Sequence, residues 1–193
     1  IHDCAGECDG SAVVDACGVC GGNGSSCGIL SGNLSGTYPA TEYQIFSDIT
    51  IVSGDTLLLE AGTEFLFDGG VNFNIYGTLK AMGTENDSII FDNYGNERWG
   101  GFTLEDASDS TAFEYVRISG AEKDYGGGMY LNNSNPTLTH VTIIGNTGEN
   151  QSGGIYLSNS HPTLTHVTIS GNTSTNNGGG MFLSNSYPTL NNV

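Results

Sequence analysis

The sequence contains very few positively charged residues. Its 193 residues include 4 Lys and Arg against 21 Asp and Glu, which gives a formal net charge of −17. Proteins that bind the phosphate backbone of nucleic acids derive that affinity from Lys and Arg. We therefore exclude nucleic acid as a partner, and the surplus of acid suits a solvated extracellular surface.

Long apolar runs are also absent. The longest pieces are short, such as Leu57-Leu58-Leu59, whereas a membrane-spanning helix needs roughly 18 apolar residues in succession. We therefore expect no insertion into a membrane. The chain begins at Ile1 without a signal peptide and stops inside a repeat. We expect it to be a processed chain or a piece of a longer one.

Cysteine is missing after residue 27, although the segment before that point is rich in it. The five cysteines are Cys4, Cys8, Cys17, Cys20 and Cys27. Segment 1–28 has too few large apolar residues to form a core, so it needs covalent or metal support. Disulfides in an oxidising compartment are the interpretation that we favour, and a tetrahedral zinc–thiolate site is the alternative. Because five is an odd number, one thiol is free or its partner lies outside the sequence.

The same segment resembles a module of secreted proteins. Asp3-Cys4-Ala5-Gly6 and Cys17-Gly18-Val19-Cys20-Gly21-Gly22 are similar to a short Cys/Gly module of large secreted surface proteins of bacteria. The second stretch is also similar to part of the cysteine-rich region of secreted thrombospondin-motif metalloproteases. The zinc-protease signature His-Glu-x-x-His does not occur in the sequence. The resemblance therefore implies an extracellular or cell-surface location and no protease activity.

Four acidic residues of this segment are candidate calcium ligands. Asp3, Glu7, Asp9 and Asp15 offer carboxylate oxygens at short spacing, as calcium prefers. A complete Asp-x-Asp-x-Asp-Gly loop is not present. Calcium is therefore the candidate cofactor of this segment's acidic residues, and ordinary solvation of surface acids is the alternative.

The C-terminal third consists of repeats with a constant step of 26 residues. Gly127-Gly128-Met129-Tyr130-Leu131 has counterparts at 153–157 and 179–183, and a Pro-Thr-Leu element follows in each repeat. Short alternating apolar runs separated by Gly, Asn, Ser and Pro predict strands and turns with no room for a helix. Such a repeat is typical of a solenoid, in which residues one repeat apart stack at ~4.8 Å.

Asparagine recurs at two positions of the repeat. Asn133, Asn159 and Asn185 come just after the first strand, and Asn146 and Asn172 form a second series. Asparagine tolerates left-handed backbone conformations, and its amide can bond the same amide in the turns above and below. We expect both series to be structural ladders that stabilise turns.

Segment 29–193 resembles the right-handed parallel β-helix repeat family. The matching motifs are Asp55-Thr56-Leu57-Leu58-Leu59-Glu60-Ala61-Gly62-Thr63, Gly77-Thr78-Leu79-Lys80-Ala81-Met82-Gly83-Thr84, Trp99-Gly100-Gly101-Phe102 and the Gly-Gly-x-Tyr-Leu-x-Asn-Ser-x-Pro-Thr-Leu repeats. The resemblance implies an all-β solenoid of about 26 residues per turn that follows the Cys/Gly segment and continues or is capped beyond Val193. The family includes pectate lyases and polygalacturonases as well as bacterial adhesins, so the fold leaves function open.

Two series of ring side chains are candidate sites. If Met129 points inward, Tyr130 points outward, and Tyr156 and Phe182 stack beside it. This aromatic ladder is a candidate binding surface for glycan or protein, and simple cross-strand packing is the alternative. His140 and His166 stack in the same way and are a candidate metal pair, with a ladder of neutral imidazoles as the alternative.

The regular repeats offer little for catalysis. Glu149 is the only acidic residue after Asp124, and no Lys or Arg follows Lys123. Glycosidases need two carboxylates at a defined separation, and we find no catalytic motif. We therefore expect an extracellular structural or adhesive protein without catalytic residues: a β-helix stalk or self-assembling, filament-forming module. Its expected partners are copies of itself or cell-surface proteins and glycans. The alternative is a carbohydrate-binding or polysaccharide-degrading β-helix.

Overall fold

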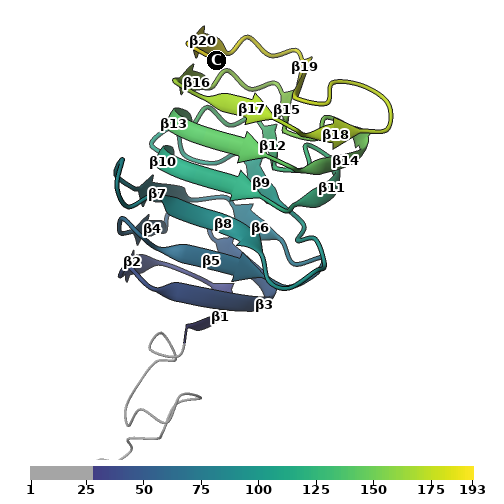
Figure 1. Cartoon of the computed structure of the whole chain (residues 1–193). Coiled ribbons are helices and arrows are strands. Elements are labelled where there is room, and N and C mark those ends of the chain that lie inside the picture. Colours follow the sequence, from purple (N-terminus) through teal and green to yellow (C-terminus); the bar gives the residue numbers. More distant parts are fainter. Residues whose placement is uncertain (1–27) are drawn as a thin grey trace, which may run out of the picture.

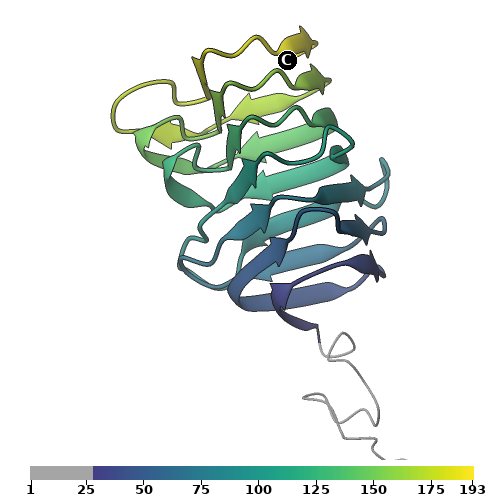
Figure 2. The same cartoon turned by 180° about the vertical axis from the view of Figure 1, so that it is seen from behind.

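The computed structural model describes residues 28–193, in which the chain winds into a stack of turns. The stack rises from β1 at one end to β20 at the other, and every pairing between strands is parallel (Figure 1). The same stack is seen from behind in Figure 2. The five cysteines and the candidate calcium ligands Asp3, Glu7, Asp9 and Asp15 lie outside the described residues.

Successive turns build three faces. The first face contains β2 (Gly36–Tyr38), β4 (Thr56–Leu59), β7 (Thr78–Met82), the first parts of β10 (Ala112–Ser119) and β13 (Thr137–Ile144), β16 (Thr163–Thr165) and β20 (Thr189–Asn191). The second face contains the first part of β3 (Glu42–Ile51), β5 (Glu64–Phe67), β8 (Ile89–Asn93), the later parts of β10 and β13, and β17 (Thr168–Ser170). The third face contains the later part of β3, β6 (Phe73–Ile75), β9 (Phe102–Glu105), β12 (Met129–Asn132), β15 (Ile155–Ser158) and β19 (Met181–Ser184). The strand β1 (Ile29–Asn33) pairs with β3 at the start of the stack.

A small second sheet projects between the second and third faces. It contains β11 (Glu122–Tyr125), β14 (Thr147–Gln151) and β18 (Thr173–Ser174), which pair in parallel at the right-hand edge of Figure 1. These strands come from the connections that lead into β12, β15 and β19. The small sheet therefore forms a wall beside the later strands of the third face.

The core is a column of buried apolar side chains along the axis. In the earlier turns it is largely aromatic: Trp99 and Phe67 stack with ring centroids 4.3 Å apart, and both are fully buried. The Trp99 indole Nε1 donates to the Ser119 carbonyl over 2.7 Å, which satisfies the polar atom of the ring. In the later turns the core becomes aliphatic, with Met129 in register with Ile155.

The 26-residue step of the repeats is confirmed as the number of residues in one turn of the solenoid. Tyr130 is in register with Tyr156 and Phe182, and Leu131 is in register with Leu157 and Leu183. Alternation along the strand buries Leu131 and Leu157 while the rings between them face outward. The all-β solenoid expected from the sequence is therefore present in residues 28–193.

Buried polar ladders hold the turns together. The Asn146 amide Nδ2 donates to Asn172 Oδ1 over 3.1 Å and to the Ile118 carbonyl over 3.1 Å, while Asn146 Oδ1 accepts from the Ala121 amide over 2.9 Å. Asn172 Nδ2 donates in turn to the Ile143 carbonyl over 2.8 Å. Asn146 is fully buried, so each of these bonds replaces hydration that the fold removes.

The other asparagine series differs from the expectation of an amide ladder. Asn133, Asn159 and Asn185 have φ values of 48°, 48° and 49°, which is the left-handed conformation, but their side chains are exposed. Within residues 28–193 no hydrogen bond joins one of these amides to another. Solvated amides one turn apart gain little by bonding each other, because water satisfies them equally well.

A serine ladder lies beside these asparagines instead. The hydroxyls of Ser134, Ser160 and Ser186 accept from the backbone amides of Ala107, Ser134 and Ser160 over 3.0, 3.1 and 3.0 Å. Each hydroxyl donates to a carbonyl two residues earlier in its own turn. The ladder is buried and repeats at the 26-residue step, so it fixes the height of each turn.

Candidate functional site

The aromatic ladder forms the outer surface of the third face. The ring centroids of Tyr130 and Tyr156 lie 5.5 Å apart at an interplanar angle of 25°, and those of Tyr156 and Phe182 lie 5.2 Å apart at 14°. Stacked rings cover one another's faces, so the middle ring offers mainly its edge to solvent. The N-terminal neighbour of Tyr130 in register is Thr103, a small residue, and the Tyr130 ring face on that side has no aromatic partner.

The small sheet adds a wall beside this ladder. Tyr125, on β11, meets the Tyr156 ring edge-on, with centroids 5.4 Å apart and an interplanar angle of 67°. Gln151 follows Tyr125 in register one turn later, and Asn177 forms a bridge with Gln151 in the turn after that. The wall therefore presents one aromatic side chain and then amide side chains along the axis.

Two hollows lie between the wall and the ladder. The first has a volume of about 390 Å³, and the second, of about 350 Å³, is lined by Tyr125, Tyr130, Gln151 and Tyr156. The residues that line the first are Gly70, Asn72, Gly100, Thr103, Glu122, Lys123, Asp124, Tyr125 and Tyr130. Since the hollows share Tyr125 and Tyr130, they adjoin one another on the outside of the solenoid, and we call the two together the axial groove. Its volume is in the range of small-ligand sites.

Lys123 closes one end of the axial groove. Its ammonium donates to Thr103 Oγ1 over 2.7 Å, to Asn72 Oδ1 over 3.1 Å and to the Gly100 carbonyl over 3.2 Å. These bonds match the three hydrogens that an ammonium carries. Burial lowers the pKa of Lys123 below its usual value, although the negative charges of Asp48 and Asp124 oppose the shift.

The Asn72 acceptor is itself held in place. Asp48 Oδ1 accepts from the Asn72 backbone amide over 2.8 Å and from Asn72 Nδ2 over 3.3 Å. Asn72 Nδ2 also donates to the Gly70 carbonyl over 3.2 Å. A chain of bonds therefore runs from Asp48 through Asn72 to Lys123 and fixes the polar end of the groove.

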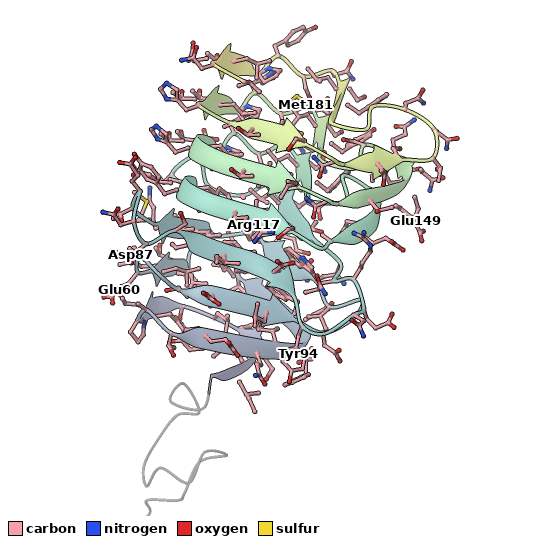
Figure 3. All side chains as sticks on the ribbon, in the orientation of Figure 1. Glu60, Asp87, Tyr94, Arg117, Glu149 and Met181 are labelled. Atoms are coloured by element: carbon pink, nitrogen blue, oxygen red, sulfur yellow. The ribbon has the colours of Figure 1, made fainter. Side chains whose placement is uncertain are left out.

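Carboxylates form the outer rim. Asp124 and Glu149 share a hydrogen bond, and this bond together with the negative charge of Asp124 raises the pKa of Glu149. Figure 3 shows Glu149 at the outer edge of the small sheet. On the same wall the Glu122 carboxylate lies 3.5 Å from Arg98 Nε. The rim is thus dominated by negative charge.

Tyr130 is neutral over the physiological range. Burial raises the pKa of Tyr130 above its usual value, with further contributions from Tyr156, Glu105 and Tyr125. The phenol of Tyr130 is therefore present as a hydrogen-bond donor and acceptor at neutral pH.

The histidine ladder occupies another part of the surface. The His140 and His166 rings are 4.7 Å apart at 15°, and Tyr115 stacks on His140 with centroids 4.5 Å apart. Parallel rings direct their nitrogen lone pairs along parallel planes, which does not bring two nitrogens onto one ion. In residues 28–193 no group of three or more His, Cys, Asp or Glu side chains could hold a metal ion.

The sequence pointed to the aromatic ladder but not to the rest of the groove. Lys123, Asn72 and Tyr125 lie outside the 26-residue repeats, in connections of irregular length. The available signal was the last positive charge of the chain, Lys123, directly before the regular turns. Its partners could not be found because they lie 20 and 51 residues earlier.

The architecture defines the class of the protein, which is a parallel β-solenoid. The family described as "Right handed beta helix region" matches residues 40–193, and the chain belongs to this family. A search of curated proteins and a search of solved structures found no match. Among the described residues no helix is long and apolar enough to cross a membrane.

Proposed function

We propose that this chain is an extracellular adhesive module that holds a polysaccharide in the axial groove without degrading it. The observation that carries the proposal is the groove itself, in which the free face of Tyr130 adjoins a hollow lined by polar side chains. Sugar rings have apolar C–H faces and polar hydroxyl edges, so they fit an aromatic surface flanked by hydrogen-bonding groups.

The direction of the groove supports a linear polymer rather than a compact ligand. The two hollows follow one another along the stack, with Gln151 and Asn177 continuing the wall beyond Tyr125. Amide side chains both donate and accept hydrogen bonds, which matches the mixed character of hydroxyl groups. A chain of sugars would meet a side chain that can form hydrogen bonds at each successive turn of the wall.

Binding without catalysis is favoured by the state of Lys123. A general base needs a free lone pair within reach of the substrate. The Lys123 ammonium already donates to Asn72, Gly100 and Thr103, which stabilise its protonated form. Degradation of a bound polysaccharide is the competing outcome, and turnover is therefore measured together with binding.

The test is a glycan-array screen with and without calcium, with turnover of each bound polysaccharide followed in parallel. We expect selective binding that Tyr130→Ala and Tyr156→Ala abolish and that chelation of calcium leaves unchanged. Tyr187→Ala is the matched control, because Tyr187 is 79% exposed and stacks on His161, outside the groove. Loss of binding in the control, or a flat array, would overturn the proposal.

End-to-end assembly is a second candidate for the adhesive role. Leu183 and Leu190 are 44% and 50% exposed, whereas Leu157 and Leu164, one turn earlier, are buried. A turn that stacks on this end, from the same chain or from a second copy, buries these side chains. Sedimentation over a range of concentrations and electron microscopy test it: rods that lengthen with concentration support assembly, and a constant single species contradicts it.

A further inference from the structure

The charges around the axial groove restrict the glycans that it can hold, and this inference rests on the proposed function. Carboxylates outnumber cations at the groove. Among the carboxylates Glu122 and Asp124 line the first hollow, and Asp48, Glu105 and Glu149 lie around it; the cations are Arg98 and Lys123. A polymer with a carboxylate on each sugar would bring further negative charge into this field.

Neither cation is available to neutralise such a polymer. Lys123 donates to three protein oxygens, and its partner Asn72 is fixed by Asp48. Arg98 Nη1 donates to the Gly145 carbonyl over 2.8 Å, and Arg98 Nε lies 3.5 Å from Glu122. Both side chains are therefore committed to contacts within the protein.

The rim offers acceptors that lack a cationic partner. Asp124 accepts from Asn150 Nδ2 over 3.3 Å, and Glu149 follows Gly148, which is in register with Lys123, so the two carboxylates lie on neighbouring strands. Two neighbouring carboxylates favour an added positive charge, because it offsets their mutual repulsion. An ammonium group carries three donors and can bond both carboxylates at once.

The aromatic part of the groove also favours a positively charged ligand. The face of an aromatic ring is negative, and it attracts an ammonium placed within about 6 Å of the ring. Tyr130 presents such a face to the hollow that Asp124 and Glu122 also line. A metal ion is a poorer fit, since no group of three or more suitable side chains occurs among residues 28–193.

We propose that the axial groove selects glycans with free amino groups, binds neutral glycans more weakly and rejects polyuronates. The ammonium groups of the sugar chain lie at the rim formed by Asp124 and Glu149, and the sugar ring lies on Tyr130. Lys123 is a positioning residue that shapes the end of the groove and does not contact a sugar carboxylate.

The experiment compares three hexasaccharides by calorimetry at low ionic strength: hexaglucosamine, hexa-N-acetylglucosamine and hexagalacturonate. We expect hexaglucosamine to bind about tenfold more tightly than the neutral hexamer, and no heat from hexagalacturonate. Raising the salt to about 0.5 M shortens the screening length and should bring the first two affinities together.

Variants test whether the rim causes the preference. Asp124→Asn combined with Glu149→Gln should remove the tenfold preference for hexaglucosamine over the neutral hexamer. Glu60→Gln combined with Asp87→Asn is the matched control, because both residues lie at the opposite edge of the solenoid from Glu149 (Figure 3). The control should keep the preference.

The outcomes separate the two proposals. Hexagalacturonate binding as tightly as hexaglucosamine, or a preference that survives in the rim variant, overturns the charge selection while glycan binding stands. Failure of all three hexamers to bind, in protein whose cooperative unfolding shows that it is folded, overturns both. Loss of all binding in Tyr130→Ala together with loss of the preference in the rim variant supports both.

Discussion

Lys123 and Asn72 are joined by a hydrogen bond of 3.1 Å across 51 residues of sequence. The bond reaches past an intermediate turn, where Lys123 also contacts the Gly100 carbonyl and Thr103. In a solenoid, most contacts join neighbouring turns only. This side chain therefore couples turns that the strand ladder connects only indirectly, and it does so at the end of the axial groove.

Replacement of Lys123 by Met should destabilise the protein by about 2 kcal/mol, since the three acceptors would lose a charged donor. Glycan binding should weaken as well, because the end of the groove would lose its shape. Denaturant unfolding and calorimetry measure the two effects. Lys80→Met is the control, since Lys80 lies on the outward side of β7 in register with Leu58 and Ala112. Equal stability loss in both variants would contradict the role of Lys123.

Replacement of Asn146 by Ala should cost about 3 kcal/mol. The variant leaves the Ala121 amide and the Ile118 carbonyl without their partner in a buried site and removes the bond to Asn172. Asn133→Ala, in which an exposed left-handed residue is changed, should cost about 1 kcal/mol through backbone strain alone. Chemical denaturation measures the free energy of unfolding of both variants. A smaller loss in Asn146→Ala than in Asn133→Ala would contradict the stabilising role of the buried asparagine ladder.

The fold could be predicted because the constant 26-residue step fixes which residues stack. Tyr130, Tyr156 and Phe182 meet in register for this reason, and so do Asn146 and Asn172. The step does not say which of the repeated polar residues lies inside the turn. Two adjacent positions, Asn133 and Ser134, repeat equally well in sequence, and the backbone turns the serine inward and the asparagine outward.

The groove could be predicted only in part, because its wall comes from connections whose lengths vary. Lys123 and Tyr125 lie beside the third face of the solenoid because β11 pairs with β14 and not with the main sheet. That pairing depends on a change of register between Lys123 and Tyr125, which has no counterpart in the repeat pattern. Such a change of register is a property of the folded backbone and has no simple signature in sequence.

Replacement of Gly154 by Ala should destabilise the protein by about 3 kcal/mol. A Cβ at this position would overlap the Gly180 carbonyl and approach Ile169 Cγ2 to 2.9 Å. Backbone of the next turn cannot move aside without breaking the ladder. Gly145→Ala is the comparison: its φ is +69° but its surroundings are open, so strain alone should cost about 1 kcal/mol. Similar thermal stabilities of the two variants would show that the close approach of the next turn does not restrict position 154 to glycine.

Alkaline pH should destabilise the protein partly through Tyr43, whose hydroxyl donates to the Pro39 carbonyl over 3.2 Å. Burial, followed by the effects of Tyr38 and Glu60, raises the pKa of Tyr43 above 10.0. The unfolded chain then ionises first, so the contribution of Tyr43 to stability is constant below pH 10 and falls as pH rises through the higher folded value. Tyr43→Phe lacks this group, and its stability should rise relative to the parent only above pH 10. A stability difference independent of pH would contradict the shift.

Asp124 influences the pKa of Glu149. A hydrogen bond from protonated Glu149 to Asp124, together with the negative charge of Asp124, raises the pKa of Glu149 above 4.5. The unfolded chain loses the Glu149 proton first, so this group's contribution to stability is lost as pH rises from 4.5 through the folded value. In Asp124→Asn the pKa of Glu149 should fall toward 4.5, and the stability profile above pH 4.5 should flatten. Carboxyl NMR titration measures both forms, with Asp109→Asn as a control. An unchanged Glu149 titration in Asp124→Asn would contradict the interaction between the two carboxylates.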